Sequence, residues 1–160
     1  MDLTTFYGFF SAMCFTLIGL WWNVVQGRPE WLRRPDLRRA VGGVYLSFLL
    51  PALMGLFAQV GGAALPAVWR VSFVGVAVVG CASTVRLWRL TRAASARRSA
   101  YQAVAAGLYL LIAVVGMAPE IASRIGLAPI QAEALLLVAL VVLAHGLVWE
   151  FMTHPDAASD

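Results

Sequence analysis

Five stretches of predominantly apolar residues, each about twenty residues long, dominate this sequence and limit what it can fold into. A helix of that length crosses the hydrocarbon core of a bilayer, where helices and closed barrels are the structures that satisfy every backbone polar group. The predicted spanning helices cover residues 5–25, 40–60, 66–88, 99–118 and 129–149. The sequence therefore predicts an all-α integral membrane protein, a bundle of five transmembrane helices. It forms one domain, 1–160, that ends in a short polar tail at 150–160.

The composition excludes an ordinary water-soluble domain. Apolar residues make up 61% of the chain and charged residues only 12%, whereas soluble domains carry about 25% charged residues. The first residues are acidic, with Asp2 before the first apolar stretch, while a secretory signal begins with a basic segment. The first stretch is therefore expected to remain in the protein as a helix.

Several helix ends are marked by residues that favour a helix start. Pro66 and Pro129 open the third and fifth predicted helices, because proline suits the first helical position. Asp36 is expected to be the N-cap of the second helix. Ser99 and Gln102 have the spacing of a capping box at the start of the fourth helix.

The arginines predict how the bundle faces the membrane. All twelve basic residues are arginine, and ten of them fall in or beside the first and third connections. Basic loops stay in the cytoplasm, and acidic residues contribute little to this rule. The N-terminus is therefore expected outside and the C-terminus in the cytoplasm. The abundance of arginine and alanine without lysine is typical of a high-GC bacterial genome, so the bacterial inner membrane is the predicted location.

The sequence contains none of the common catalytic motifs, so an enzyme is not favoured. Cys14 and Cys81 lie singly within apolar stretches and signal neither a disulfide framework nor a metal site. No cofactor and no metal are predicted. The net charge of +4 sits in short loops, where membrane orientation explains it better than nucleic-acid binding.

One candidate polar cluster lies near the cytoplasmic ends of the helices. It consists of Asn23, Arg86, His145 and Glu150. Polar side chains at membrane depth are costly and often functional. One interpretation is that Arg86 could pair with Glu150, which would leave His145 to bond Asn23 in a protonatable pocket. The simpler interpretation is a set of interfacial residues that extend toward the headgroups.

A second candidate cluster lies near the outer ends and consists of Arg70, Glu120, Arg124 and Glu133. Glu120 and Arg124 are four residues apart, the spacing of a helical ion pair. Glu133 falls in the predicted first turn of its helix, and it could meet Arg70 if the third and fifth helices are neighbours. Interfacial charge that remains exposed is the simpler interpretation.

Three hypotheses for function follow. The first is a small transport or channel-type protein that uses the two polar clusters. The second is a non-catalytic membrane subunit or scaffold that docks a partner, or a second copy of itself, through its arginine-rich cytoplasmic loops and faces of small residues. The third, less favoured, is a lipid-modifying or redox membrane enzyme. The partner common to all three is a bilayer whose inner leaflet is anionic, because Trp31 and Leu32 lie between arginines in the first loop.

Overall fold

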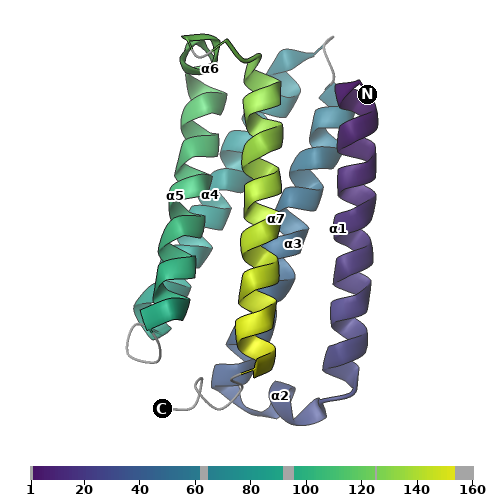
Figure 1. The fold of residues 1–160 in the computed structure, drawn as a ribbon, viewed down its shortest axis with the longest axis vertical. Coiled ribbons are helices and arrows are strands. Elements are labelled where there is room, and N and C mark those ends of the chain that lie inside the picture. The colour runs from purple at the N-terminus through teal and green to yellow at the C-terminus, as the bar shows by residue number, and fades with distance from the viewer. Residues whose placement is uncertain (1, 62–64, 92–95, 125, 154–160) are drawn as a thin grey trace.

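The computed structural model describes residues 2–61, 65–91, 96–124 and 126–153. Five long helices lie side by side in these ranges (Figure 1). They are α1 (Leu3–Gln26), α3 (Pro35–Gly61), α4 (Pro66–Thr91), α5 (Ala96–Met117) and α7 (Pro129–Thr153). Each is long and apolar enough to cross a membrane, which confirms the predicted helical membrane bundle. Residues 150–153 of the predicted tail belong to α7, and residues 154–160 lie outside the described residues.

Two short helices join the long ones at opposite ends of the bundle. Helix α2 (Pro29–Arg33) lies between α1 and α3, and α6 (Glu120–Arg124) lies between α5 and α7. Figure 1 shows α6 at the same end of the bundle as the N-terminus and α2 at the other end, where α7 finishes. We call the end with α2 the arginine-rich end and the end with α6 the opposite end.

Helix starts agree in part with the sequence patterns. Pro66 and Pro129 begin α4 and α7, as predicted. Helix α3 begins at Pro35, so Asp36 lies inside its first turn, and the prediction that it is the N-cap is wrong. Helix α5 begins at Ala96, which places Ser99 within the helix and not at its N-cap. The Ser99 hydroxyl instead accepts a hydrogen bond from the Trp88 indole on α4.

Four of the long helices form a ring. Helix α3 packs against α4 and α7, and α5 packs against the same two helices. Helix α1 lies outside this ring, mainly against α3 (Figure 1). At this contact a Cβ on Gly55 would collide with the Ser11 hydroxyl, which donates to the carbonyl of Ala52 at 3.1 Å. Small residues let membrane helices approach this closely.

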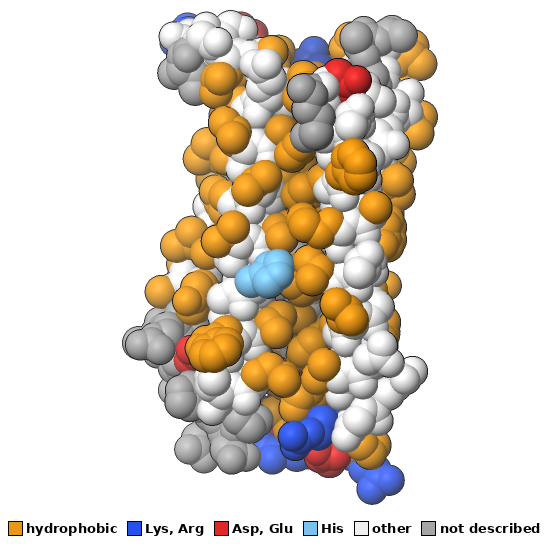
Figure 2. All heavy atoms as spheres, turned by 45° about the vertical axis from the view of Figure 1, so that its right-hand side comes forward, with side chains coloured by type: hydrophobic (Ala, Val, Ile, Leu, Met, Phe, Trp, Pro, Cys, Tyr) orange, Lys and Arg blue, Asp and Glu red, His pale blue; other side chains and the backbone are white. Residues whose placement is uncertain are grey.

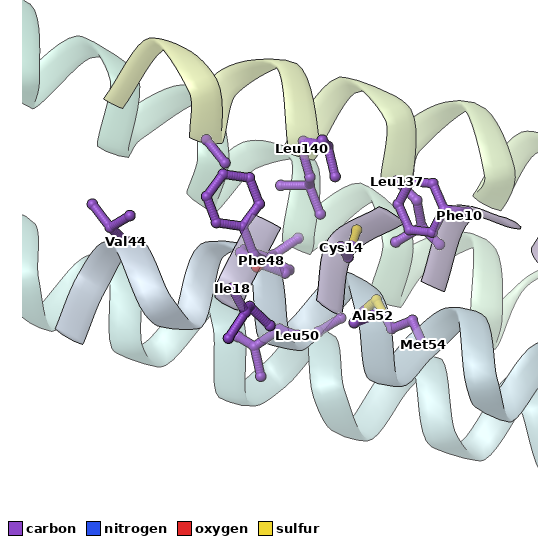
Figure 3. Close-up of a cluster of buried hydrophobic side chains, with 14 of the residues drawn as sticks. Phe10, Cys14, Ile18, Val44, Phe48, Leu50, Ala52, Met54, Leu137 and Leu140 are labelled. Carbon is purple, nitrogen blue, oxygen red and sulfur yellow. The ribbon is translucent and has the colours of Figure 1, made fainter. Parts of the chain in front are cut away.

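The buried core joins α1, α3 and α7. Figure 3 shows Phe10 and Cys14 of α1 beside Met54 of α3 and Leu137 of α7. Leu137, Met54 and Cys14 are fully buried. In lipid, packing of this kind and interhelical hydrogen bonds hold a bundle together, because the acyl chains are as apolar as the side chains.

The outer surface is apolar along most of the length of the helices (Figure 2). Phe9, Val71 and Trp149, for example, are about 70% exposed. A surface of this kind would drive aggregation in water, whereas in a bilayer the same side chains contact acyl chains.

Helix α2 closes the arginine-rich end. Trp31 is buried, stacks on Trp21 and meets the ring of Phe151 edge-on at 4.8 Å. Trp31 therefore packs inside the bundle, while Leu32 beside it remains exposed. The guanidinium of Arg28 lies 5.8 Å from the Trp31 ring, a cation–π contact that helps to hold α2 in place.

Candidate functional site

A cavity of about 580 Å³ lies within the ring of helices, in its half nearest the arginine-rich end. All four ring helices contribute to its wall. The residues of α3 and α4 are Arg39, Gly42, Gly43, Tyr45, Leu46, Ser47, Leu50, Gly80, Ser83, Thr84, Arg86 and Leu87. The residues of α5 and α7 are Tyr101, Gln102, Ala105, Tyr109, Leu140, Leu143, Ala144 and Leu147. This volume falls in the range of small-molecule sites, about 300–1,000 Å³.

Glycines shape the wall by admitting large side chains. A Cβ on Gly80 would lie 2.5 Å from Cε1 of Tyr109, so the Tyr109 ring rests directly against the backbone of α4. On α3, a Cβ on Gly43 would lie 2.9 Å from Cδ2 of Leu87. At Gly43 a larger residue would require the end of the Leu87 side chain to shift, whereas at Gly80 it would collide with the Tyr109 ring, so Gly80 sets how closely α4 approaches α5.

The rim of the cavity is basic. Arg39 and Arg86 both line it and both remain exposed, so the cavity meets the surface at the arginine-rich end. None of the described residues that line it is acidic. Two guanidinium groups without a carboxylate make this rim electropositive, and each group carries planar donors that match carboxylate and phosphate oxygens.

Two hydroxyl groups in the wall are available to a ligand. Ser and Thr in helices commonly bond the carbonyl four residues earlier, and Ser72 on α4 does so, donating to Val68 at 2.7 Å. Ser83 and Thr84, about two turns before the end of α4 at Thr91, are half-buried and make no hydrogen bond among the described residues. Both line the cavity.

The deep part of the cavity is apolar and closed. Leu50 on α3 and Leu140 on α7 lie farthest from the rim, next to Tyr109. Leu50 is eleven residues from Arg39, which corresponds to about 16 Å along the helix. Beyond this floor Phe73, Ile112 and Leu137 are each 0% exposed and fill the other half of the ring. Among the described residues, the cavity is therefore confined to the half of the ring nearest the arginine-rich end, and buried apolar side chains occupy the other half.

The structure separates the four residues of the predicted cytoplasmic cluster. Asn23 is exposed on α1, outside the ring. Arg86 lines the cavity together with Arg39, and the structure does not pair it with Glu150, which is buried and lies outside the cavity wall. The exposed His145 does not meet Asn23: its Nδ1 bonds the carbonyl of Val141 at 2.8 Å.

The predicted cluster at the opposite end is brought together only in part. Glu133 is 0% exposed, and it lies beyond the first turn of α7, contrary to the prediction. Arg70 donates from Nε to the carbonyl of Gly116 at 2.9 Å and not to Glu133. Glu120 and Arg124 are exposed on α6, and no ion pair joins them within the described part of the chain.

Most of the pocket does not follow from the sequence patterns. Arg39 belongs to the arginine pattern that predicts the topology, and Tyr101 and Tyr109 belong to no functional pattern. A signal was present on α4, where Gly80, Ser83, Thr84 and Leu87 follow the three- and four-residue spacing of one helix face. Three small or hydroxyl-bearing residues on one face of an apolar helix indicate that the face does not point to lipid.

The geometry of the described residues contains no group of three or more His, Cys, Asp or Glu side chains that could hold a metal ion. Comparison of the chain with protein-family models, with curated proteins and with solved structures gives no match.

Proposed function

We propose that this protein is a membrane carrier that binds an anionic amphiphile, a molecule with a phosphate or carboxylate head and an apolar tail, in the cavity of the helix ring. One observation carries the proposal: the cavity has a basic rim, hydroxyl groups in its wall and a closed apolar depth. A wholly polar solute would gain nothing from the leucines, and a neutral apolar one would gain nothing from the arginines.

The head of the ligand is assigned to the rim. Arg39 and Arg86 supply charge-assisted hydrogen bonds, which contribute about 1.5–3 kcal/mol each when the donor or acceptor is charged. The unbonded hydroxyls of Ser83 and Thr84 lie between this rim and the apolar depth, so they are placed to bond oxygens next to the head. Charge near the low-dielectric core strengthens each of these contacts.

The tail is assigned to the leucine-lined depth. Leu50, Leu140 and Leu143 offer an apolar surface within the bundle, and each buried methylene group of a ligand contributes about 0.8 kcal/mol. The closed floor at Tyr109 limits the length of chain that fits. A ligand of this kind can enter along the membrane surface, since its own tail already lies in the bilayer.

The one-ended pocket favours a carrier over a channel. A channel needs a continuous polar path, whereas Phe73, Ile112 and Leu137 block the ring beyond the floor. The positive-inside rule assigns the arginine-rich end to the cytoplasm, so the pocket faces the cytoplasmic leaflet. We propose that this arrangement is the inward-facing state of the carrier.

Binding of alkyl phosphate to the purified protein tests the proposal. The protein is held in an uncharged maltoside detergent, so membrane orientation plays no part, and dodecyl phosphate is titrated into it. We expect saturable binding that dodecyltrimethylammonium does not reproduce. The double variant Arg39→Gln/Arg86→Gln should weaken binding of the phosphate at least about tenfold, since about 1.4 kcal/mol is enough for that change.

Arginines from the same end of the bundle provide the matched control. Arg38 and Arg89 are exposed and do not line the cavity. The double variant Arg38→Gln/Arg89→Gln removes the same charge and should bind dodecyl phosphate as the unmodified protein does. Equal losses in the two double variants would show general surface attraction in place of a pocket, and the proposal would then be abandoned.

A further inference from the structure

Among the acidic and basic side chains in the described part of the chain, that of Glu133 is the most deeply buried. Its side chain is 0% exposed, and neither carboxyl oxygen has a hydrogen-bond partner among the described residues. It lies near the start of α7, in the half of the ring opposite the pocket. An ionisable group at such a position is costly, and in membrane proteins it commonly marks a route for ions or protons.

The donors nearest to Glu133 are engaged elsewhere. The hydroxyl of Tyr7 on α1 donates to the carbonyl of Ile130 at 2.7 Å. The guanidinium of Arg70 on α4 donates to the carbonyl oxygens of Gly116 and Met117, at 2.9 and 3.2 Å. These carbonyls belong to the last turn of α5, whose final carbonyl groups have no partner within the helix.

Gly116 is where Arg70 and Glu133 come together. A Cβ on Gly116 would lie 3.8 Å from Oε1 of Glu133, and Gly116 is also the residue whose carbonyl accepts from Arg70. The two side chains therefore approach the same residue of α5. Arg70 is bonded to the backbone there, and the carboxyl group of Glu133 has no donor among the described residues.

The absence of a donor fixes the charge of Glu133 in this arrangement. A buried carboxylate without compensating hydrogen bonds is far more costly than a buried neutral carboxyl group. Glu133 is therefore protonated here. When the proton leaves, the carboxylate requires a cation, and Arg70 is the cation within reach.

We propose that Glu133 is a proton-binding site at the opposite end of the bundle, and that Arg70 is the alternate partner of its carboxylate. With the proton bound, Arg70 ties α4 to the end of α5. With the proton released, Arg70 leaves the carbonyls of Gly116 and Met117 and pairs with Glu133, which ties α4 to α7.

The other charged and titratable groups at this end are few. Tyr7 of α1 interacts with Glu133, Arg70 of α4 and Glu133 both approach Gly116, and Asp2, Glu120 and Arg124 are exposed. Residues 51–61 of α3 and 110–117 of α5 carry no titratable side chain. A metal ion would need several oxygen ligands, and the nearby carbonyls of α5 already bond Arg70. A proton is therefore the ligand that fits.

A proton site at one end and an amphiphile pocket at the other describe a proton-coupled carrier. That coupling rests on the proposed carrier function, whereas the proton site does not. The two are tested by separate measurements: binding of dodecyl phosphate reports the pocket, and infrared absorption of the carboxyl group reports the proton.

Infrared difference spectroscopy of the protein in lipid nanodiscs tests the proton site. The neutral carboxyl C=O stretch is followed as the pH is raised in the absence of any amphiphile. We expect a band of a buried neutral carboxyl group that is present at neutral pH, disappears at alkaline pH and is absent from Glu133→Gln. The matched control Glu120→Gln, on the exposed α6, should retain the band. A band that survives in Glu133→Gln, or its absence from the unmodified protein, would refute the site.

Arg70→Gln tests the alternate partner. Without the guanidinium the carboxylate has no cation to pair with, so the band should persist at pH values at which the unmodified protein loses it. The variant Arg124→Gln, at the same end on α6, should behave as the unmodified protein. If Arg70→Gln titrates unchanged, Arg70 is not the partner of Glu133. This comparison does not depend on whether Glu133→Gln folds.

Discussion

Replacing Gly80 by alanine tests the packing that forms the floor of the pocket. The added Cβ would lie 2.5 Å from Cε1 and 2.7 Å from Cδ1 and Cζ of Tyr109, whereas carbon atoms in contact prefer about 3.5–4.0 Å. The Tyr109 ring, only 3% exposed, must therefore move by about 1 Å. Because the Tyr109 ring lines the cavity, we expect it to move into the cavity.

Gly75 on the same helix supplies the reference for the size of this effect. Nothing lies within 4 Å of a Cβ at Gly75. The two glycine-to-alanine changes share the same gain in helix propensity, so the difference between them isolates the steric effect. Overpacking costs about 1–3 kcal/mol, which corresponds to a roughly 5- to 150-fold difference in the unfolding equilibrium constant.

Unfolding in mixed micelles measures that difference. The protein is titrated with sodium dodecyl sulfate, and the free energies of unfolding of Gly80→Ala and Gly75→Ala are compared. We expect Gly80→Ala to be less stable by the amount above, and to bind dodecyl phosphate more weakly because Tyr109 then occupies part of the pocket. Stabilities equal to within about 0.5 kcal/mol, the usual scatter of surface substitutions, would refute the packing of Tyr109 against α4.

Two further predictions concern hydrogen bonds at the opposite end of the bundle. Tyr7→Phe should lower the free energy of unfolding by about 0.5–1.5 kcal/mol, because it removes the bond to the Ile130 carbonyl; Tyr45→Phe, whose hydroxyl has no partner among the described residues, should leave it unchanged. The amide of Thr5 donates to Asp2 at 2.6 Å, and this bond holds the pKa of Asp2 below its ordinary value of 3.8. This bond, which caps α1, is therefore fully formed above pH 3.8. It is lost as the pH falls through the lower pKa that Asp2 has in the folded state. Hydrogen-exchange protection of the Thr5 amide should fall in that acid range, and it should be low at every pH in Asp2→Ala.

The five long helices could be predicted from the sequence because the signal is local and strong. A bilayer demands an uninterrupted apolar stretch of a set length, and each stretch can be read without knowing its neighbours. The ends were harder to place. Helix α3 begins at Pro35, five residues before the predicted start, because Arg38 and Arg39 are helical although they are too polar to count as part of an apolar span. Arginine side chains near the end of a spanning helix can extend toward the headgroups.

The pocket could not be predicted, because it depends on how four helices are rotated about their axes. Arg39 and Arg86 are 47 positions apart in the chain, and only the packing of α3 against α4 places both on one rim. The burial of Glu133 has the same origin. Its position in the sequence suggests a carboxylate exposed at the membrane interface, and only the packing of its neighbours, Tyr7 of α1 and Gly116 of α5 among them, shows that it is buried.

The pocket and the proton site meet at one interface, which gives their coupling a physical route. Arg70 bonds the carbonyls of Gly116 and Met117 across α4 and α5, and Gly80 contacts Tyr109 across the same two helices. Gly80 lies ten residues from Arg70, about 15 Å along α4. A helix transmits a shift over that distance with little bending, so release of Arg70 from α5 would change the contact that forms the floor of the pocket. The substitution Gly80→Ala, which disturbs that contact directly, should therefore alter the alkaline titration of Glu133, while Gly75→Ala should not.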